Sequence, residues 1–336
     1  MQNNGVTAEP GSVARKLDEI AAATRKTETV LATFSSRREP QRAPAPAPEP
    51  AGSPEDQPAL ALGTSAAEFA PPLDTADFIR ALNQAYEKEA NPAARDAMAQ
   101  ILINSRMCAQ GHRPICQDTG IVTAFLRVGM NVRWEGSMSV TDMVNEGVRR
   151  AYLHPDNTLR ASILEDPDGS RRNTGDNTPC VIHYELVPGD MLEIHLAAKG
   201  GGSEAKTKFA MLNPSDSVVE WVLQMVPVMG AGWCPPGMLG VGIGGTAEKA
   251  MLLAKEALLE PIDIQDLRER GPASRAEELR LELYDKINRL GIGAQGLGGL
   301  TTVLDVKVKD FATHAANKAV AIIPNCAATR HAHFTL

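Results

Sequence analysis

The 336-residue sequence lacks several features that would assign it to common classes of protein. It has no apolar run long enough to span a bilayer. It also has no run of basic residues, and its net charge is −7, which argues against nucleic acid as a partner. The N-terminus shows neither the basic and apolar regions of a secretory signal nor the composition of a transit peptide. We therefore expect a cytoplasmic, globular protein that acts on a small molecule, with no membrane partner.

Cysteine is scarce, and its distribution limits what it can do. The chain has five cysteines, an odd number, spread too thinly for a disulfide framework: Cys108, Cys116, Cys180, Cys234 and Cys326. In a reducing compartment, metal ligation and simple burial of the thiol are the two remaining roles.

Proline is concentrated in one stretch. Residues 40 to 72 contain nine of the 23 prolines, mixed with Ala, Ser and Glu, a composition typical of extended, solvated chain. Before this stretch, Val13, Leu17, Ile20 and Leu31 have roughly helical spacing, which indicates either a frayed surface helix or a docking helix. We expect residues 1–72 to be a disordered extension and residues 73–336 to be the folded domain.

Helical and strand patterns alternate along the folded domain. Helices are predicted from about residue 73 to 90, from Pro92 to about Arg106 with Asn91 as N-cap, and over 215–226, 246–259 and 275–289. Strands are predicted over 121–128, 180–187, 191–198, 301–310 and 319–325, with a turn at 188–190. The interleaving predicts a mixed α/β fold with mixed β-sheets.

Three of the five cysteines share a local setting. Cys116, Cys234 and Cys326 each lie in or beside a turn rich in Gly, Pro or Asn, whereas the other two do not. Their separations of 118 and 92 residues exclude a ferredoxin-type run, whose ligands come from one loop. The separations permit an iron–sulfur cluster held by three converging loops, with one iron left open as a Lewis acid. Spacing alone favours buried thiols over this alternative.

Several polar residues near these turns are candidates for binding or catalysis. Asp118 is either a general base or the cap of its own turn. His314 either donates a hydrogen bond to a bound carboxylate or is structural, and we interpret His183 and His195 as structural. Arginines and lysines in turn-rich segments either bind carboxylates or are solvated: Arg160, Lys206 and Arg330.

Three glycine-rich segments complete the set of candidate loops. The segment 199–207, KGGGSEAKT, offers consecutive amides that can surround an anion. Gly240, Gly242 and Gly245 match the dinucleotide pattern GxGxxG only formally, because no buried strand is predicted before them. A close approach of the backbone to a ligand is the interpretation we favour there. Residues 291–302 form a third such loop.

Taken together and in this order, the motifs PICQDTG, NTGDNTP, KGGGSEAKT, CPPGMLGVGIGGTAEKA and NCAATRHAH resemble the iron–sulfur hydro-lyases. The similarity is to the α part of class I fumarases and of two-subunit tartrate dehydratases, over roughly residues 75 to 336. It implies an α-type catalytic domain that reversibly hydrates fumarate to L-malate, and the C-terminal tail is more similar to the fumarases. Tartrate dehydration and a non-catalytic metal-binding scaffold are the alternatives.

The resemblance also implies roles for particular residues. A [4Fe–4S] cluster would be held by Cys116, Cys234 and Cys326. The substrate, a small dicarboxylate, would contact a set of matching residues: Gln117, Asp118, Arg160, the Gly201 and Gly202 backbone, and His314. Family members contain a second, C-terminal or β part that completes the site. We therefore expect a β-type subunit or a further domain as partner, and a dimer of the completed enzyme.

Overall fold

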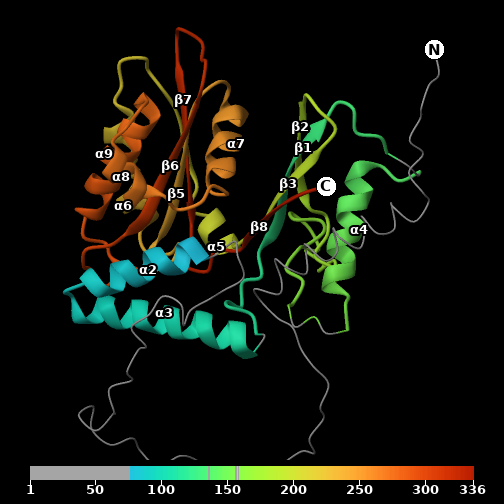
Figure 1. Ribbon diagram of the computed structural model, residues 1–336, viewed down its shortest axis with the longest axis horizontal. Helices are drawn as coiled ribbons and strands as arrows, with labels where there is room; N and C mark the ends of the chain where they lie inside the picture. The colour runs from blue at the N-terminus through green and yellow to red at the C-terminus, as the bar shows by residue number, and fades with distance from the viewer. Residues whose placement is uncertain (1–75, 112, 135–136, 156, 158) are drawn as a thin grey trace, which may run out of the picture.

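A computed structural model describes residues 76–111, 113–134, 137–155, 157 and 159–336. These residues form eight α-helices and two four-stranded sheets, one in each of two lobes (Figure 1). The strands are β1 Ile121–Gly129, β2 Val181–Val187, β3 Leu192–Lys199, β4 Lys208–Leu212, β5 Gly237–Gly244, β6 Val303–Phe311, β7 Lys318–Asn325 and β8 His331–Thr335. The helices are α2 Ala76–Lys88, α3 Pro92–Gly111, α4 Val140–Tyr152, α5 Gly201–Glu204, α6 Val218–Met229, α7 Ala247–Ala257, α8 Ile264–Arg270 and α9 Arg275–Asn288.

The first sheet has the strand order β2-β1-β3-β8. Strand β1 pairs in parallel with β2 and antiparallel with β3, and β3 pairs antiparallel with β8. One face of this sheet packs on α4, which buries Val144 and Val148 against Leu126 and Ile194. The strands predicted over 180–187 and 191–198 are therefore present, but β1 lies between them. The short turn joins two strands that are not hydrogen-bonded neighbours.

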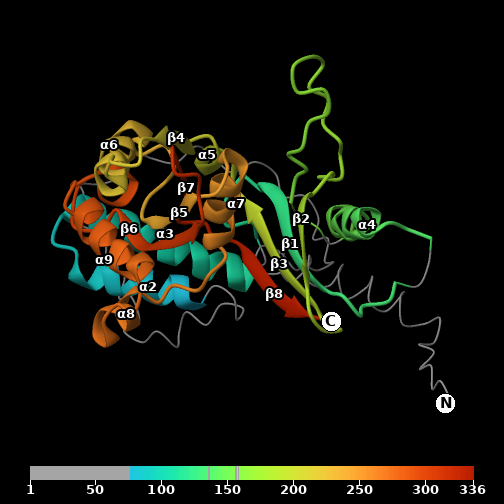
Figure 2. The ribbon, with the colours of Figure 1, turned by 90° about the horizontal axis from the view of Figure 1, so that it is seen from above.

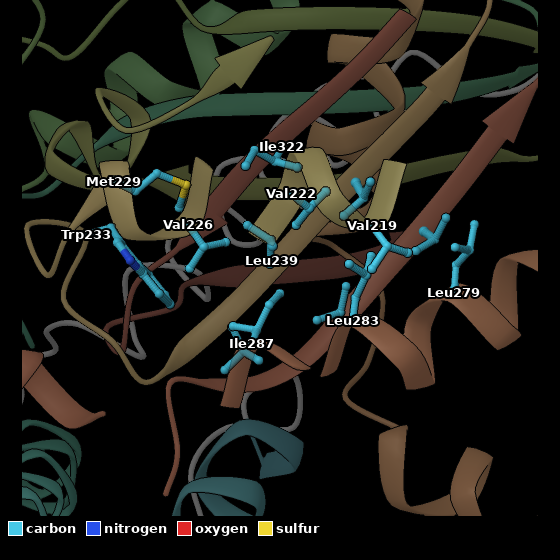
Figure 3. Close-up of a cluster of buried hydrophobic side chains, with 14 residues drawn as sticks. Val219, Val222, Val226, Met229, Trp233, Leu239, Leu279, Leu283, Ile287 and Ile322 are labelled. Carbon is cyan, nitrogen blue, oxygen red and sulfur yellow. The ribbon is translucent and has the colours of Figure 1, made fainter. Parts of the chain in front are cut away.

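The second sheet has the order β4-β7-β5-β6 and forms the larger core. Helices α6 and α9 cover one face, where apolar side chains from both helices and from β5 and β7 interdigitate (Figure 3). Val222, Leu283 and Ile322 are fully buried in this cluster. Helix α6 begins after Ser217, whose hydroxyl accepts a hydrogen bond from the Glu220 amide at 3.2 Å, so the sequence itself fixes where this helix starts.

Helix α7 covers the opposite face of the second sheet and lies between the two sheets (Figure 2). The glycines of β5 allow this close packing: a Cβ at Gly240 would lie 2.1 Å from the Ala254 carbonyl oxygen, and one at Gly242 would lie 1.9 Å from that of Ala250. The expectation that this glycine pattern brings the backbone close to a ligand is therefore wrong, because the close neighbour is α7. Two of the three glycines, Gly240 and Gly242, also lie inside a strand, unlike the glycines of a dinucleotide-binding turn.

The structure confirms the mixed α/β class. It also confirms the helices predicted before Cys116, including the cap at Asn91, whose side chain accepts from the Ala93 amide at 3.0 Å. Helices α4, α5 and α8 and strands β4, β5 and β8 were not predicted. The proline-rich extension over 1–72 and the helix proposed over 13–31 lie outside the described residues. Within the described part of the chain, no helix combines the length and apolar character needed to cross a membrane.

Candidate active site

Four loops meet where the two sheets adjoin. The segment from α3 to β1 carries Cys116 to Gly120, and the turn after β3 carries the glycines that begin α5. The segment from α6 to β5 carries Cys234, and Cys326 lies on the connection that leaves β7 in one sheet and enters β8 in the other. The pairing of the strands explains why these loops converge. Ile121 at the start of β1 faces Lys199 at the end of β3, and Met238 near the start of β5 faces Asn325 at the end of β7.

The structure brings the three predicted cysteine ligands into one region. The backbones of two of the loops are joined, because the Ala327 amide donates to the Cys234 carbonyl at 3.1 Å. Burial raises the pKa of the Cys234 thiol, and negative charge on Cys326, Cys116 and Asp118 raises it further. Charges act strongly only over short distances. The three thiols and Asp118 therefore lie near one another, with Cys234 exposed and the other two cysteines half-buried.

The Asp118 carboxyl is held at the centre of this group. One of its oxygens accepts from the Gly120 amide at 3.1 Å, and the other accepts from the Gly202 amide at 3.1 Å. The Asp118 amide lies 3.5 Å from the Cys116 sulfur. The glycine loop thus already binds a carboxylate, that of Asp118, through one of the amides expected to bind substrate.

Arg160 and Gln117 lie beside this carboxyl. The Arg160 guanidinium donates to the Gln117 carbonyl at 3.1 Å, while its side chain remains exposed. The Gln117 side-chain oxygen accepts from the Cys116 thiol at 3.2 Å. Buried Thr119 fixes the arginine backbone, because its hydroxyl donates to the Arg160 carbonyl at 2.7 Å. An exposed guanidinium anchored to the residue before Asp118 can bind one end of a small dicarboxylate.

His314 is not brought to this group. It lies in the loop between β6 and β7, is exposed, and accepts a hydrogen bond from the Ala316 amide at 3.1 Å. Strand β7 runs eight residues from this loop to the Cys326 turn, a span of about 26 Å at the usual strand rise. Within one chain, a substrate at the cysteines does not reach His314, and its role in substrate contact stays a prediction.

Two cationic side chains, Lys199 and Arg330, are buried near the cysteine turns, whereas the sequence indicated only that they lie near turns. Lys199 is 4% exposed, and its ammonium donates to the Gly200 carbonyl at 3.4 Å and to the Ser203 hydroxyl. Burial lowers the pKa of Lys199 to about 8, against the opposing effect of Glu204. Arg330 is 2% exposed. Lys206 packs against Gly232, two residues before Cys234. The sequence contained a signal for the lysines, since both flank the glycine loop, but none for the burial of Arg330.

The remaining cysteines are packed thiols, as the sequence suggested. Cys108 and Cys180 are buried, and burial raises the pKa of Cys180 to about 12 and that of Cys108 in the same direction. His183 and His195 lie in strands, and burial lowers the pKa of each.

The third glycine loop, residues 291–302, is structural. The backbone and side-chain nitrogens of Gln295 both donate to the Pro235 carbonyl, each at 2.7 Å, which supports the turn that carries Cys234.

Fold and site together define a mixed α/β protein in which loops from both sheets bring Cys116, Cys234, Cys326 and Asp118 near one another, with Arg160 hydrogen-bonded to the neighbouring Gln117. The fumarate hydratase (Fumerase) family model matches residues 67–335. The chain belongs to this family, and the predicted resemblance to hydro-lyases is confirmed.

Curated relatives agree with the assignment. The putative L(+)-tartrate dehydratase subunit alpha of Methanocaldococcus jannaschii is 36% identical over 262 residues, covering 76% of this chain and 90% of the relative. The L(+)-tartrate dehydratase subunit alpha of Escherichia coli O157:H7 is 31% identical over 258 residues, covering 76% of this chain and 82% of the relative. The K12 strain protein of the same name is 30% identical over the same length.

Proposed function

We propose that the chain is the α part of a fumarate hydratase that reversibly adds water to fumarate to give L-malate. The convergence of Cys116, Cys234 and Cys326 beside Asp118 is the observation that carries the proposal. Membership of the fumarate hydratase family supports the reaction class. In this proposal the three cysteines hold a [4Fe–4S] cluster.

The chemistry of the donors fits such a cluster. Among the residues that the structure describes, no group of three His, Cys, Asp or Glu side chains closes around the position of a single metal ion. A cube with iron at separate corners needs three thiolates that are near one another but need not meet at one point. Three thiolates leave one iron without a protein ligand. When bound, the cluster supplies an open iron that acts as a Lewis acid and activates water.

The chain's own residues have separate roles in this proposal. Arg160 binds one carboxylate of the substrate, and the Gly201 amide helps to orient it. Such positioning lowers the barrier by several kcal/mol in well-aligned cases. The Gly202 amide, also expected to bind substrate, donates to Asp118 instead. Asp118 transfers the proton, because its carboxyl group lies near the cysteines and is fixed by two backbone amides. The Gln117 side chain is hydrogen-bonded to the Cys116 thiol and contacts the substrate.

A second part completes the enzyme in this proposal. The curated relatives are named as alpha subunits, which supports a β-type subunit as partner. We propose in addition that the completed enzyme is a dimer. Arg160 and Cys234 are exposed and available to such a partner. We also propose a cytoplasmic location, because the five cysteines are all free thiols and an exposed cluster needs a reducing compartment.

L(+)-tartrate is the second candidate substrate, and the names of the relatives favour it. Both substrates are small diacids that Arg160 can bind, so the chain's own residues do not separate them. Anaerobic kinetics with the β part, comparing kcat/KM for fumarate and L(+)-tartrate, decides between them. Higher kcat/KM for tartrate would replace fumarate in the proposal.

Replacement of Asp118 and Arg160 tests whether the chain is an enzyme or a metal-binding scaffold. We expect Asp118→Asn and Arg160→Met to lose turnover by at least about 100-fold while the iron content stays unchanged. Arg127→Met, at an exposed arginine of β1, is the matched control and should keep wild-type turnover. Activity that survives both site substitutions would exclude the proposed roles and favour a scaffold.

A further inference from the structure

Arg330 links three parts of the site through its guanidinium and its backbone. It lies four residues after Cys326 and directly before β8. Its Nε donates to the Ala198 carbonyl on β3 at 3.0 Å, and its Nη1 donates to the Asp118 carbonyl. Its own carbonyl accepts from the Ala198 amide at 3.0 Å. One side chain thus connects a cysteine turn, the end of β3 and the Asp118 turn.

The Arg330 guanidinium is buried and donates its hydrogen bonds to the backbone. Among the described residues the guanidinium forms no ion pair, and its two hydrogen bonds go to backbone carbonyls. Arg280 is a useful contrast, since it is 7% exposed and pairs with Asp263 and Asp305. Two directed hydrogen bonds to carbonyls of different segments fix the Arg330 guanidinium, so its planar geometry matters in addition to its charge.

The Arg330 side chain and the Asp118 carboxyl group both lie against Gly200. A Cβ built on Gly200 would lie 3.2 Å from Asp118 Oδ2 and 3.6 Å from Arg330 Nη2. The backbone at Gly200 has φ −59° and ψ 133°, which any residue adopts. Glycine at position 200 therefore leaves room for the Asp118 carboxyl group and the Arg330 guanidinium.

We propose that Arg330 is a positioning residue that sets the place of the Asp118 carboxyl group relative to the glycine loop. The planar guanidinium bridges the carbonyls of Ala198 and Asp118 at fixed angles. A lysine ammonium reaches only one of these carbonyls unless the backbone moves. Loss of the bridge frees the Asp118 turn from β3 and weakens the bonds from the Gly202 and Gly120 amides to the carboxyl group. The expected effect of Arg330 on catalysis rests on the proposed function, whereas its effect on the position of Asp118 does not.

Amide hydrogen exchange in the cluster-free protein tests the positioning directly. In Arg330→Lys we expect the Gly202 and Gly120 amides to exchange at least about 10-fold faster, because both donate to Asp118. Amides in the α6 and α9 core should be unchanged. The control Arg127→Lys, at an exposed position of β1, should leave all of these rates at wild-type values. Unchanged exchange at Gly202 in Arg330→Lys would overturn the proposal.

Kinetics of the reconstituted enzyme give the second readout. A displacement of Asp118 should lower kcat by about 10- to 100-fold, with KM and iron content within about threefold of wild type. A rise in KM alone would make Arg330 a substrate contact, and a parallel loss of iron would make it a support for the cluster. Either result would overturn the proposal. If the wild type shows no turnover, the proposed function fails, but the exchange result still decides this inference.

Gly200→Ala is the second variant if Arg330→Lys does not fold. The added methyl group contacts the Asp118 carboxyl group in a backbone conformation that accepts alanine. We expect faster exchange at the Gly202 amide and a reduced kcat, with the iron content retained. Wild-type exchange and wild-type kcat in Gly200→Ala would contradict the adjacency on which the proposal depends.

Discussion

The buried ammonium of Lys199 predicts a particular dependence of stability on pH. Its side chain is 3% exposed, 3.6 Å from Glu204, and burial lowers its pKa to about 8 from an ordinary value of 10.5. The unfolded chain therefore binds more protons than the folded chain between these two pKa values, so stability rises with pH in that window. The shift corresponds to a penalty of about 3 kcal/mol at neutral pH.

Lys199→Met removes the titrating group and keeps the length of the side chain. Between about pH 7 and pH 9.5, the unfolding free energy of the wild type should gain about 2 kcal/mol relative to Lys199→Met. Comparing the two proteins cancels the titration of their other groups. The absolute difference at one pH is less informative, because the variant also loses the bonds to the Gly200 carbonyl and the Ser203 hydroxyl.

Urea unfolding of the cluster-free protein at both pH values measures this difference. Lys286→Met, on the exposed surface of α9, is the matched control and should show no change with pH. A wild-type minus Lys199→Met difference that is the same at both pH values would mean that Lys199 titrates near its ordinary pKa. The description of a dry, buried lysine beneath the glycine loop would then be refuted.

Three further substitutions test the packing that holds the site. Gly242→Ala places a methyl group against the Ala250 carbonyl; we expect a loss of about 1 to 3 kcal/mol in urea unfolding, and wild-type stability would contradict the close packing of α7. Leu283→Ala, at a fully buried position, should cost about 2 to 5 kcal/mol, and a loss below about 1 would contradict the core. Asp305→Asn leaves buried Lys307 without its buried counter-charge and should lower stability by about 3 to 5 kcal/mol; unchanged thermal unfolding would refute that pairing.

Local patterns predicted much of the fold. Helix α2 has Phe78, Ile79 and Leu82 on one face, and α3 begins at a proline after a capping asparagine, so both were found from spacing and end signals. Strand β5 was missed because four glycines in eight residues are typical of a loop. Two of them, Gly240 and Gly242, reflect contact with α7, which a single sequence does not show. The insertion of β1 between β2 and β3 depends likewise on tertiary pairing.

Part of the candidate site could likewise be predicted from local sequence, and part depends on tertiary structure. Turn residues around Cys116, Cys234 and Cys326 marked these cysteines as a set, but their separations could not show that the turns meet. Only the resemblance to a family suggested that they do. The burial of Arg330 could not be predicted, because an arginine after a turn is usually solvated. Its place follows from the crossing of the chain from β7 to β8, which is a feature of the whole fold.

The central claim is that three distant cysteines hold one iron–sulfur cluster, and iron content tests it most directly. Iron and sulfide should be measured per chain in anaerobically prepared wild type and in single Cys→Ser variants at all five positions. We predict about four irons per chain in the wild type, a loss of the cluster in the variants at 116, 234 and 326, and wild-type iron in those at 108 and 180. A wild type without iron, or a cluster that survives loss of any one of the three cysteines, would contradict the account.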